Sequence, residues 1–183
     1  MGIDELSDTD LLSLGRTRPE ALGVVYERHA PAVHRHLARR VGTAAAEDLL
    51  GEVFAAAVAG RLRVRPHDSG SALPWLYGIA GNVVRSHLRR PGARVVADDV
   101  HCVDWDAVDA RIDAGARRQE LRVALAALTE AGRELLLLVA WEGLSPAEAA
   151  QALGLTPVAA RSRLHRARTR AAAALDELTS AGL

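Results

Sequence analysis

The chain has 183 residues, of which 49% are hydrophobic, so it can form one ordinary domain or two small ones with a buried core. Its 23 basic residues, all of them arginine, are balanced by 23 acidic residues. The single cysteine excludes a disulfide-rich protein, and the acidic start is unlike a secretion signal. The longest apolar run, residues 135–141, is too short to span a membrane, so we expect a cytoplasmic protein.

The first half of the chain predicts four helices. Asp8 is suited to cap a short first helix that runs through Leu14. The three longer helices cover about residues 20–40, 44–59 and 74–90. Pro31 lies inside the second of them and predicts a kink or a break there. Residues 61–73, which contain proline and glycine, are expected to form a loop before the fourth helix.

Charge is distributed unevenly along the chain. Residues 75–94 carry four arginines and residues 155–174 carry five, and neither segment contains an acidic residue. Between them, residues 95–113 carry six aspartates and one arginine. A single basic segment is usually a solvated helix face, but two acid-free segments, each ending an apolar-periodic stretch, favour a polyanionic partner.

The most specific pattern is SPAEAAQALGLTPVAARSRLHRAR, which begins at Ser145. Ser145 and Glu148 form a capping box, and Pro146 suits the first position of the helix. Gly154 is suited to the left-handed residue that ends this helix, and Thr156 caps the next one. The pattern therefore predicts a helix-turn-helix, in which the small residues Ala150 and Ala160 allow the two helices to cross closely.

The second helix of this motif is suited to DNA. It buries alanines and Leu164, while arginines occupy its other sides. Arginine in the N-terminal half of such a helix can reach guanine edges in the major groove, and arginine farther along suits phosphates. We expect Arg161, Ser162 and Arg166, which lie nearest one stripe, to contact bases.

Both halves of the chain resemble the extracytoplasmic-function (ECF) group of bacterial RNA polymerase sigma factors. The second half resembles region 4 in the EGLSPAEAA, LGLT and RSRLHRAR segments. The first half resembles region 2 in AEDLLGEVF and in the helix from Trp75-Leu76 to Leu88-Arg89-Arg90. The resemblance implies two all-helical domains, residues 8–92 and 114–178, joined by an acidic linker of residues 93–113.

The resemblance also implies the roles of individual residues. The second domain would bind the −35 promoter element and the β flap of core RNA polymerase, and the first would bind the −10 element and the β′ clamp. The residues expected at the −35 element are Thr156, Arg161, Ser162, Arg163, His165 and Arg166. Those expected at the −10 element are Arg63, Trp75, Asn82, Arg85, Ser86 and Arg89. Those expected on core polymerase are Glu47, Asp48 and Glu52.

Two aromatic residues and one sequence departure bear on these roles. Trp75 and Tyr77 are both suited to stack on bases, although burial statistics favour Trp75 as a core residue. Val158-Ala159-Ala160-Arg161 stands where the family frequently has Gly-Thr-Val-Lys. This departure removes a hydroxyl from the second helix and is expected to change which −35 sequence is read.

Other readings stay open at this stage. A stand-alone helix-turn-helix regulator would bind a palindromic operator as a dimer without polymerase. A helical enzyme is disfavoured, because no catalytic motif is present. His29, His34 and His36 have no carboxylates that complete a metal site, so we expect no metal and no cofactor. An anti-sigma factor is a further partner that the resemblance suggests, and Cys102 is expected to be a bystander thiol.

Overall fold

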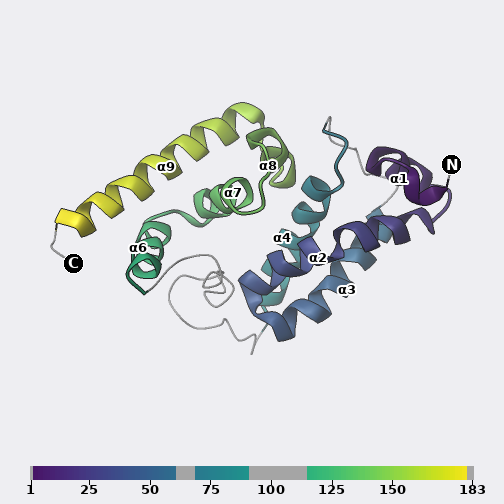
Figure 1. The fold of residues 1–183 in the computed structure, drawn as a ribbon, viewed down its shortest axis with the longest axis horizontal. Coiled ribbons are helices and arrows are strands. Elements are labelled where there is room, and N and C mark those ends of the chain that lie inside the picture. Colours follow the sequence, from purple (N-terminus) through teal and green to yellow (C-terminus); the bar gives the residue numbers. More distant parts are fainter. Residues whose placement is uncertain (1, 61–68, 91–114, 181–183) are drawn as a thin grey trace. The chain divides into compact units, whose positions relative to one another are not determined.

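The computed structural model describes residues 2–60, 69–90 and 115–180, with side chains from residue 119 onward in the last range. The chain divides into two compact units, Met1–Val95 and Val96–Leu183. The described residues of both units form helices and short connections (Figure 1). The expectations for the acidic linker, Cys102 and Arg63 lie outside the described residues, and the exact domain bounds stay a prediction.

The first unit is built on three helices that all contact one another (Figure 1). These are α2 (Ala21–Val41), α3 (Thr43–Gly60) and α4 (Leu73–Leu88), preceded by the 3₁₀ turn η1 (Ile3–Glu5) and by α1 (Asp8–Leu14), which packs on α2. Their shared core consists of side chains at most 1% exposed: Leu11, Leu12, Val25, Val33, Leu37, Leu49, Val53, Leu76 and Val84. These residues recur at helical spacing, so each helix turns one apolar side inward.

Two details of this unit differ from expectation. Ser7, not Asp8, caps α1, because the Ser7 hydroxyl accepts a hydrogen bond from the Asp10 N–H at 3.2 Å. The helix α2 continues through Pro31, so the expected break is wrong. Pro31 is exposed, and burial of α2 residues on both sides of it, such as Val25 and Val33, offsets the lost backbone hydrogen bond.

The second unit places three shorter helices along one long helix (Figure 1). The shorter ones are α6 (Gly115–Ala126), α7 (Glu130–Ala140) and α8 (Pro146–Ala152), and the long one is α9 (Pro157–Ser180). Each of the three contacts α9. Leu125, Leu128 and Ala167 form a buried cluster between α9 and the α6–α7 junction. The core of this unit therefore lies along one side of α9 and leaves its other sides in solvent.

Candidate nucleic-acid interface

The turn between α8 and α9 has the predicted helix-turn-helix geometry. The Ser145 N–H donates to Glu148 Oε2 at 2.8 Å, and the Glu148 N–H donates to Ser145 Oγ at 3.2 Å, so the capping box is complete. Gly154 has a φ of +63°, in the left-handed region that glycine adopts without strain. The Ala159 N–H donates to Thr156 Oγ1 at 3.2 Å, which confirms the second cap.

The side of α9 that faces the other helices is made of small and apolar residues. Ala150 of α8 and Ala160 of α9 are 1% and 0% exposed, as close crossing of the two helices requires. Leu164 and Ala167 continue the buried side of α9 by helical spacing. This inner side fixes which residues of α9 are left for a partner.

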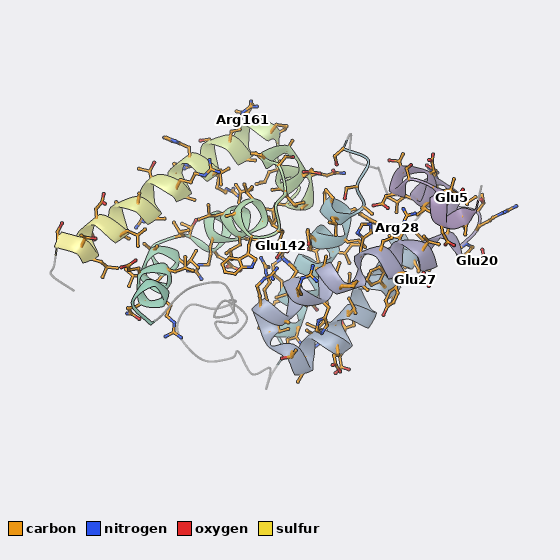
Figure 2. All side chains as sticks on the ribbon, viewed as in Figure 1. Glu5, Glu20, Glu27, Arg28, Glu142 and Arg161 are labelled. Carbon is orange, nitrogen blue, oxygen red and sulfur yellow. The ribbon has the colours of Figure 1, made fainter. Side chains whose placement is uncertain are left out.

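The side of α9 opposite this core is exposed. Ser162 and His165 lie on it, and Figure 2 shows Arg161 projecting outward from the first turns of the helix. At about 100° per residue, Arg161 and Arg166 lie roughly 140° apart around the helix. The three residues expected in one stripe therefore spread over a wide arc: Arg161 lies at one edge, and Ser162 and Arg166, which are about 40° apart, lie toward the other edge.

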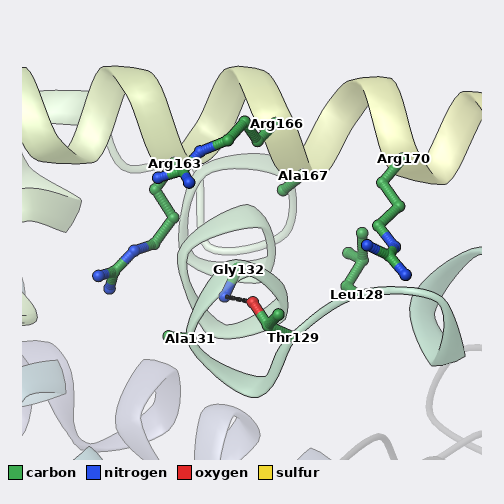
Figure 3. Close-up of a pocket in the computed structure, with 8 residues that line it drawn as sticks. All are labelled: Leu128, Thr129, Ala131, Gly132, Arg163, Arg166, Ala167 and Arg170. Carbon is green, nitrogen blue, oxygen red and sulfur yellow. Dashed lines mark hydrogen bonds between the residues drawn. The ribbon is translucent and has the colours of Figure 1, made fainter.

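Arg166 belongs with a second group of arginines beside the outward side. Arg163, Arg166 and Arg170 recur at helical spacing and line a cavity of about 340 Å³ (Figure 3). The opposite wall is the start of α7, where the Gly132 N–H donates to Thr129 Oγ1 at 3.2 Å. None of the eight described residues that line the cavity is acidic. Three guanidinium groups make this flank of α9 electropositive, and Glu130 in the first turn of α7 offsets part of the charge at that helix end.

The first unit places most of the residues predicted for the −10 element on one side of α4. Trp75, Asn82, Ser86 and Arg89 follow the helical period on the side away from the buried Leu76, Ala80 and Val84. Asn82 and Arg89 are exposed, and Trp75, Arg85 and Ser86 are half-buried. The Arg85 guanidinium donates to Asn82 Oδ1 at 2.7 Å, which joins two of the predicted residues.

The two aromatic residues of α4 differ in their surroundings. Tyr77 is 4% exposed, and its ring lies 4.7 Å from that of the buried His36, so the idea that Tyr77 stacks on bases is wrong. Trp75 is half-buried and lies on the same side of α4 as Asn82. Of the two rings, Trp75 is the one with surface left to offer a base.

The acidic side of α3 is present as predicted. Glu47, Asp48 and Glu52 are exposed, while the neighbouring Leu49 and Val53 are buried. Glu52 Oε1 lies 3.3 Å from Arg90 Nη1 in a pair whose two side chains are both largely in solvent. Such a pair is weak, so it leaves the carboxylate available for exchange to another cation.

Asp8 has a role that local sequence patterns do not indicate. Its carboxylate accepts hydrogen bonds from Arg28 Nη1 at 3.0 Å, from the Ala72 N–H at 2.9 Å and contacts His29 Nε2 at 2.6 Å. Burial raises the pKa of Asp8, but the Ala72 N–H, the His29 charge and Arg28 outweigh it, so the pKa lies below its usual value. These partners are 20 to 64 residues away in sequence, and only the fold brings them together.

The described residues offer neither a metal centre nor a membrane anchor. Within residues 2–60, 69–90 and 115–180, no three side chains of histidine, cysteine, aspartate or glutamate are grouped so that they could bind a metal ion. None of the helices described there combines the length and the apolar character that crossing a membrane demands.

Comparison with known proteins accounts for both units. Residues 25–94 match the family described as Sigma-70 region 2, and residues 118–170 match Sigma-70, region 4. CarQ, an RNA polymerase sigma factor of Myxococcus xanthus, is 36% identical over 163 residues, which cover 87% of this chain and 91% of CarQ. The ECF RNA polymerase sigma factor SigC of Mycobacterium tuberculosis (strain CDC 1551 / Oshkosh) is 32% identical over 169 residues, 90% and 89% of the two chains.

The chain belongs to the ECF group of RNA polymerase sigma factors. The predicted all-helical fold with two sigma domains is confirmed by a solved structure of CnrH in complex with the cytosolic domain of CnrY. CnrH has a TM-score of 0.63, shares 24% identity and covers 96% of this chain and 99% of its own. The sigma factor acts with core RNA polymerase on promoter DNA in transcription initiation, and the stand-alone regulator is not favoured.

Proposed function

We propose that α9 of this sigma factor enters the major groove of the −35 element with its outward side toward the bases. The observation that carries the proposal is the division of α9 into a small-residue side against α8 and a solvent side that carries no acidic residue before Asp176. Arg161, Ser162 and His165 lie near the N-terminal end of α9, where a recognition helix approaches base edges. Thr156, whose hydroxyl caps α9 at the turn before it, is proposed to contact a phosphate.

The arginines on the flank of α9 have a different role in this proposal. Arg163, Arg166 and Arg170 line one electropositive wall together with the start of α7. Guanidinium groups and helix N-termini both bind phosphate oxygens, which are repeated along a DNA strand. These three residues therefore track the backbone and hold α9 in register, while the outward side selects the sequence.

The −10 element is proposed to bind the outward side of α4. Trp75 offers a ring face, and Asn82 and Ser86 offer hydrogen-bonding groups along the same side. Base stacking on an aromatic ring and hydrogen bonds to a base edge offset the cost of unpairing a few bases. Arg85 and Arg89 add positive charge for the strand that carries those bases, and Arg63 is proposed for the same strand.

Core polymerase is proposed to bind α3 through its acidic side. Glu47, Asp48 and Glu52 project from neighbouring turns of one helix, so they can pair with a row of basic side chains on the β′ clamp. The second unit is proposed to contact the β flap. Since the sigma factor RpoE of Bartonella quintana, whose structure resembles this fold with a TM-score of 0.52, was solved with the anti-sigma factor NepR, we further propose an anti-sigma partner for this chain.

The same proposal covers location and chemistry. Promoter binding with core polymerase takes place where the chromosome is, so the protein is proposed to act in the cytoplasm. It supplies binding free energy and no reaction of its own, so it is proposed to be a non-enzymatic factor.

Run-off transcription tests this function directly. Core polymerase is incubated with genomic promoter fragments in the presence and absence of the purified chain. Start sites that appear only with the chain, and that share two short elements at a fixed spacing, are the expected result. The proposal would be contradicted if the chain alone bound duplex operators tightly and did not change where core polymerase starts. That result would favour a stand-alone helix-turn-helix regulator.

A further inference from the structure

Val158 is an apolar side chain held in solvent at the start of α9. It is 67% exposed, the highest value among the large exposed hydrophobic residues that the structure describes. It is the second residue of α9, and valine is a poorer helix former than alanine at such a position. Neither burial nor helix formation within this chain therefore explains a valine here.

The surroundings of Val158 are those of the outward side of α9. At about 100° per residue, Val158 lies roughly 160° from the buried Ala160 and on the same side as Ser162 and His165. The spacing from Val158 to Ser162 and to His165 is four and seven residues, so the three side chains form one row. This row begins with methyl groups and continues with polar groups.

The major groove contains one apolar group, the C5-methyl of thymine. Residues at the N-terminal end of a recognition helix lie closest to the base edges. We infer that Val158 packs against the C5-methyl of a thymine in the −35 element and thereby makes that thymine a determinant of promoter choice. This inference rests on the proposed placement of α9 in the major groove.

The size of the effect follows from the contact. Removing one methyl group from an apolar contact costs about 0.8 kcal/mol, which corresponds to about a four-fold loss of affinity. Replacing thymine by deoxyuridine removes only this methyl group and leaves every hydrogen-bonding atom of the base in place. The comparison of Val158→Ala with wild type on the two bases therefore isolates the proposed contact.

The test uses the full chain with core polymerase. Wild-type and Val158→Ala holoenzymes each select from a promoter library randomised over the −35 element. The position at which only wild type enriches thymine is then synthesised with deoxyuridine, and the affinity of both holoenzymes is measured. Val58→Ala, which alters an exposed valine on α3, serves as the matched control and should select the same bases as wild type.

The expected result is a thymine preference that Val158→Ala loses, with an affinity drop of about four-fold on deoxyuridine for wild type and none for the variant. Identical selection by both proteins, or an equal deoxyuridine effect in both, overturns the inference and leaves the proposed function intact. Unchanged selection with weaker binding of core polymerase assigns Val158 to a protein contact and also overturns it. If wild type enriches no −35 sequence, the proposed placement of α9 fails first and the inference fails with it.

Discussion

The side chain of Asp8 accepts a hydrogen bond from the backbone N–H of Ala72 at 2.9 Å. This bond joins the first helix of the sigma factor to the turn that begins α4, the helix proposed to contact the −10 element. Because the same carboxylate also contacts Arg28 and His29 of α2, one partly buried charge connects α1, α2 and the turn before α4. The start of the chain is therefore part of the framework that positions α4.

Replacing this carboxylate should destabilise the first unit. We expect Asp8→Ala to lower the free energy of unfolding by about 1–3 kcal/mol, since it removes the acceptor for two donors on α2 and for one on the turn before α4. Denaturant titration of the full chain measures the change. Asp4→Ala is the matched control, because the Asp4 side chain is exposed, and it should shift the value by less than about 0.5 kcal/mol. Equal stability of the two variants would contradict the role given to Asp8.

The titration of the Asp8 carboxylate should also change how the free energy of unfolding depends on pH. The pKa of Asp8 is lowered in the folded protein relative to its ordinary value of 3.8. Its stabilising contribution is therefore complete above that ordinary value and is lost as the pH falls through the folded pKa. The difference in unfolding free energy between wild type and Asp8→Asn should be constant near neutral pH and shrink below about pH 4. A difference that stays constant into strong acid would contradict this assignment.

The two groups of side chains on α9 should respond differently to salt. Arg163→Ala and Arg170→Ala are expected to weaken −35 binding equally on all sequences and to reduce the salt slope by about one unit each, since a phosphate contact releases counterions. Arg161→Ala, if it removes a base contact, should cost about 1–3 kcal/mol and relax the sequence preference. Affinity measured against salt concentration on matched and mismatched promoters separates the two. Specificity lost in Arg170→Ala would place that residue at a base.

Gly154 should be the most sensitive position of the helix-turn-helix backbone. An alanine there would be forced into the left-handed region and should cost about 1 kcal/mol, although no atom lies within 4 Å of the added methyl group. Gly51 is helical, and an added Cβ there also meets nothing within 4 Å. Gly51→Ala should therefore stabilise the protein by about 0.5–1 kcal/mol in the same denaturant titration. Destabilisation by both variants would mean that backbone strain at Gly154 is not the cause.

Charge reversal on α3 should separate polymerase binding from folding. Glu47→Lys and Asp48→Lys are expected to weaken binding of core polymerase, more so at low salt, and to leave the unfolding free energy within about 0.5 kcal/mol. Competition against another sigma factor for a limiting amount of core polymerase gives the affinity. Glu20→Lys, an exposed reversal just before α2, is the control and should compete like wild type. Undiminished competition by the α3 variants would exclude this surface.

The sequence predicted best those structural features that depend on residues close together in the chain. Ser145, Glu148 and Gly154 act within one helical turn of their partners, and all three lie in the structure as predicted. The acidic side of α3 follows from spacing alone in the same way. Long-range relationships were not visible: Asp8 finds its partners far along the chain, and Tyr77 is buried because the neighbouring helix α2 carries His36. The break expected at Pro31 was wrong for the same reason, since packing on both sides of it holds α2 together, while the alternative of a kink stays a prediction.

The crossing of α8 and α9 depends on Ala150, Gly154 and Ala160, and the outward row of α9 contributes nothing to it. Substitutions at Val158, Ser162 or His165 can therefore accumulate without endangering the scaffold. A duplicated copy of such a gene is free to acquire a new regulon by surface drift alone. For the same reason, engineered variants that differ only in this outward row should direct polymerase to different promoters in one cell.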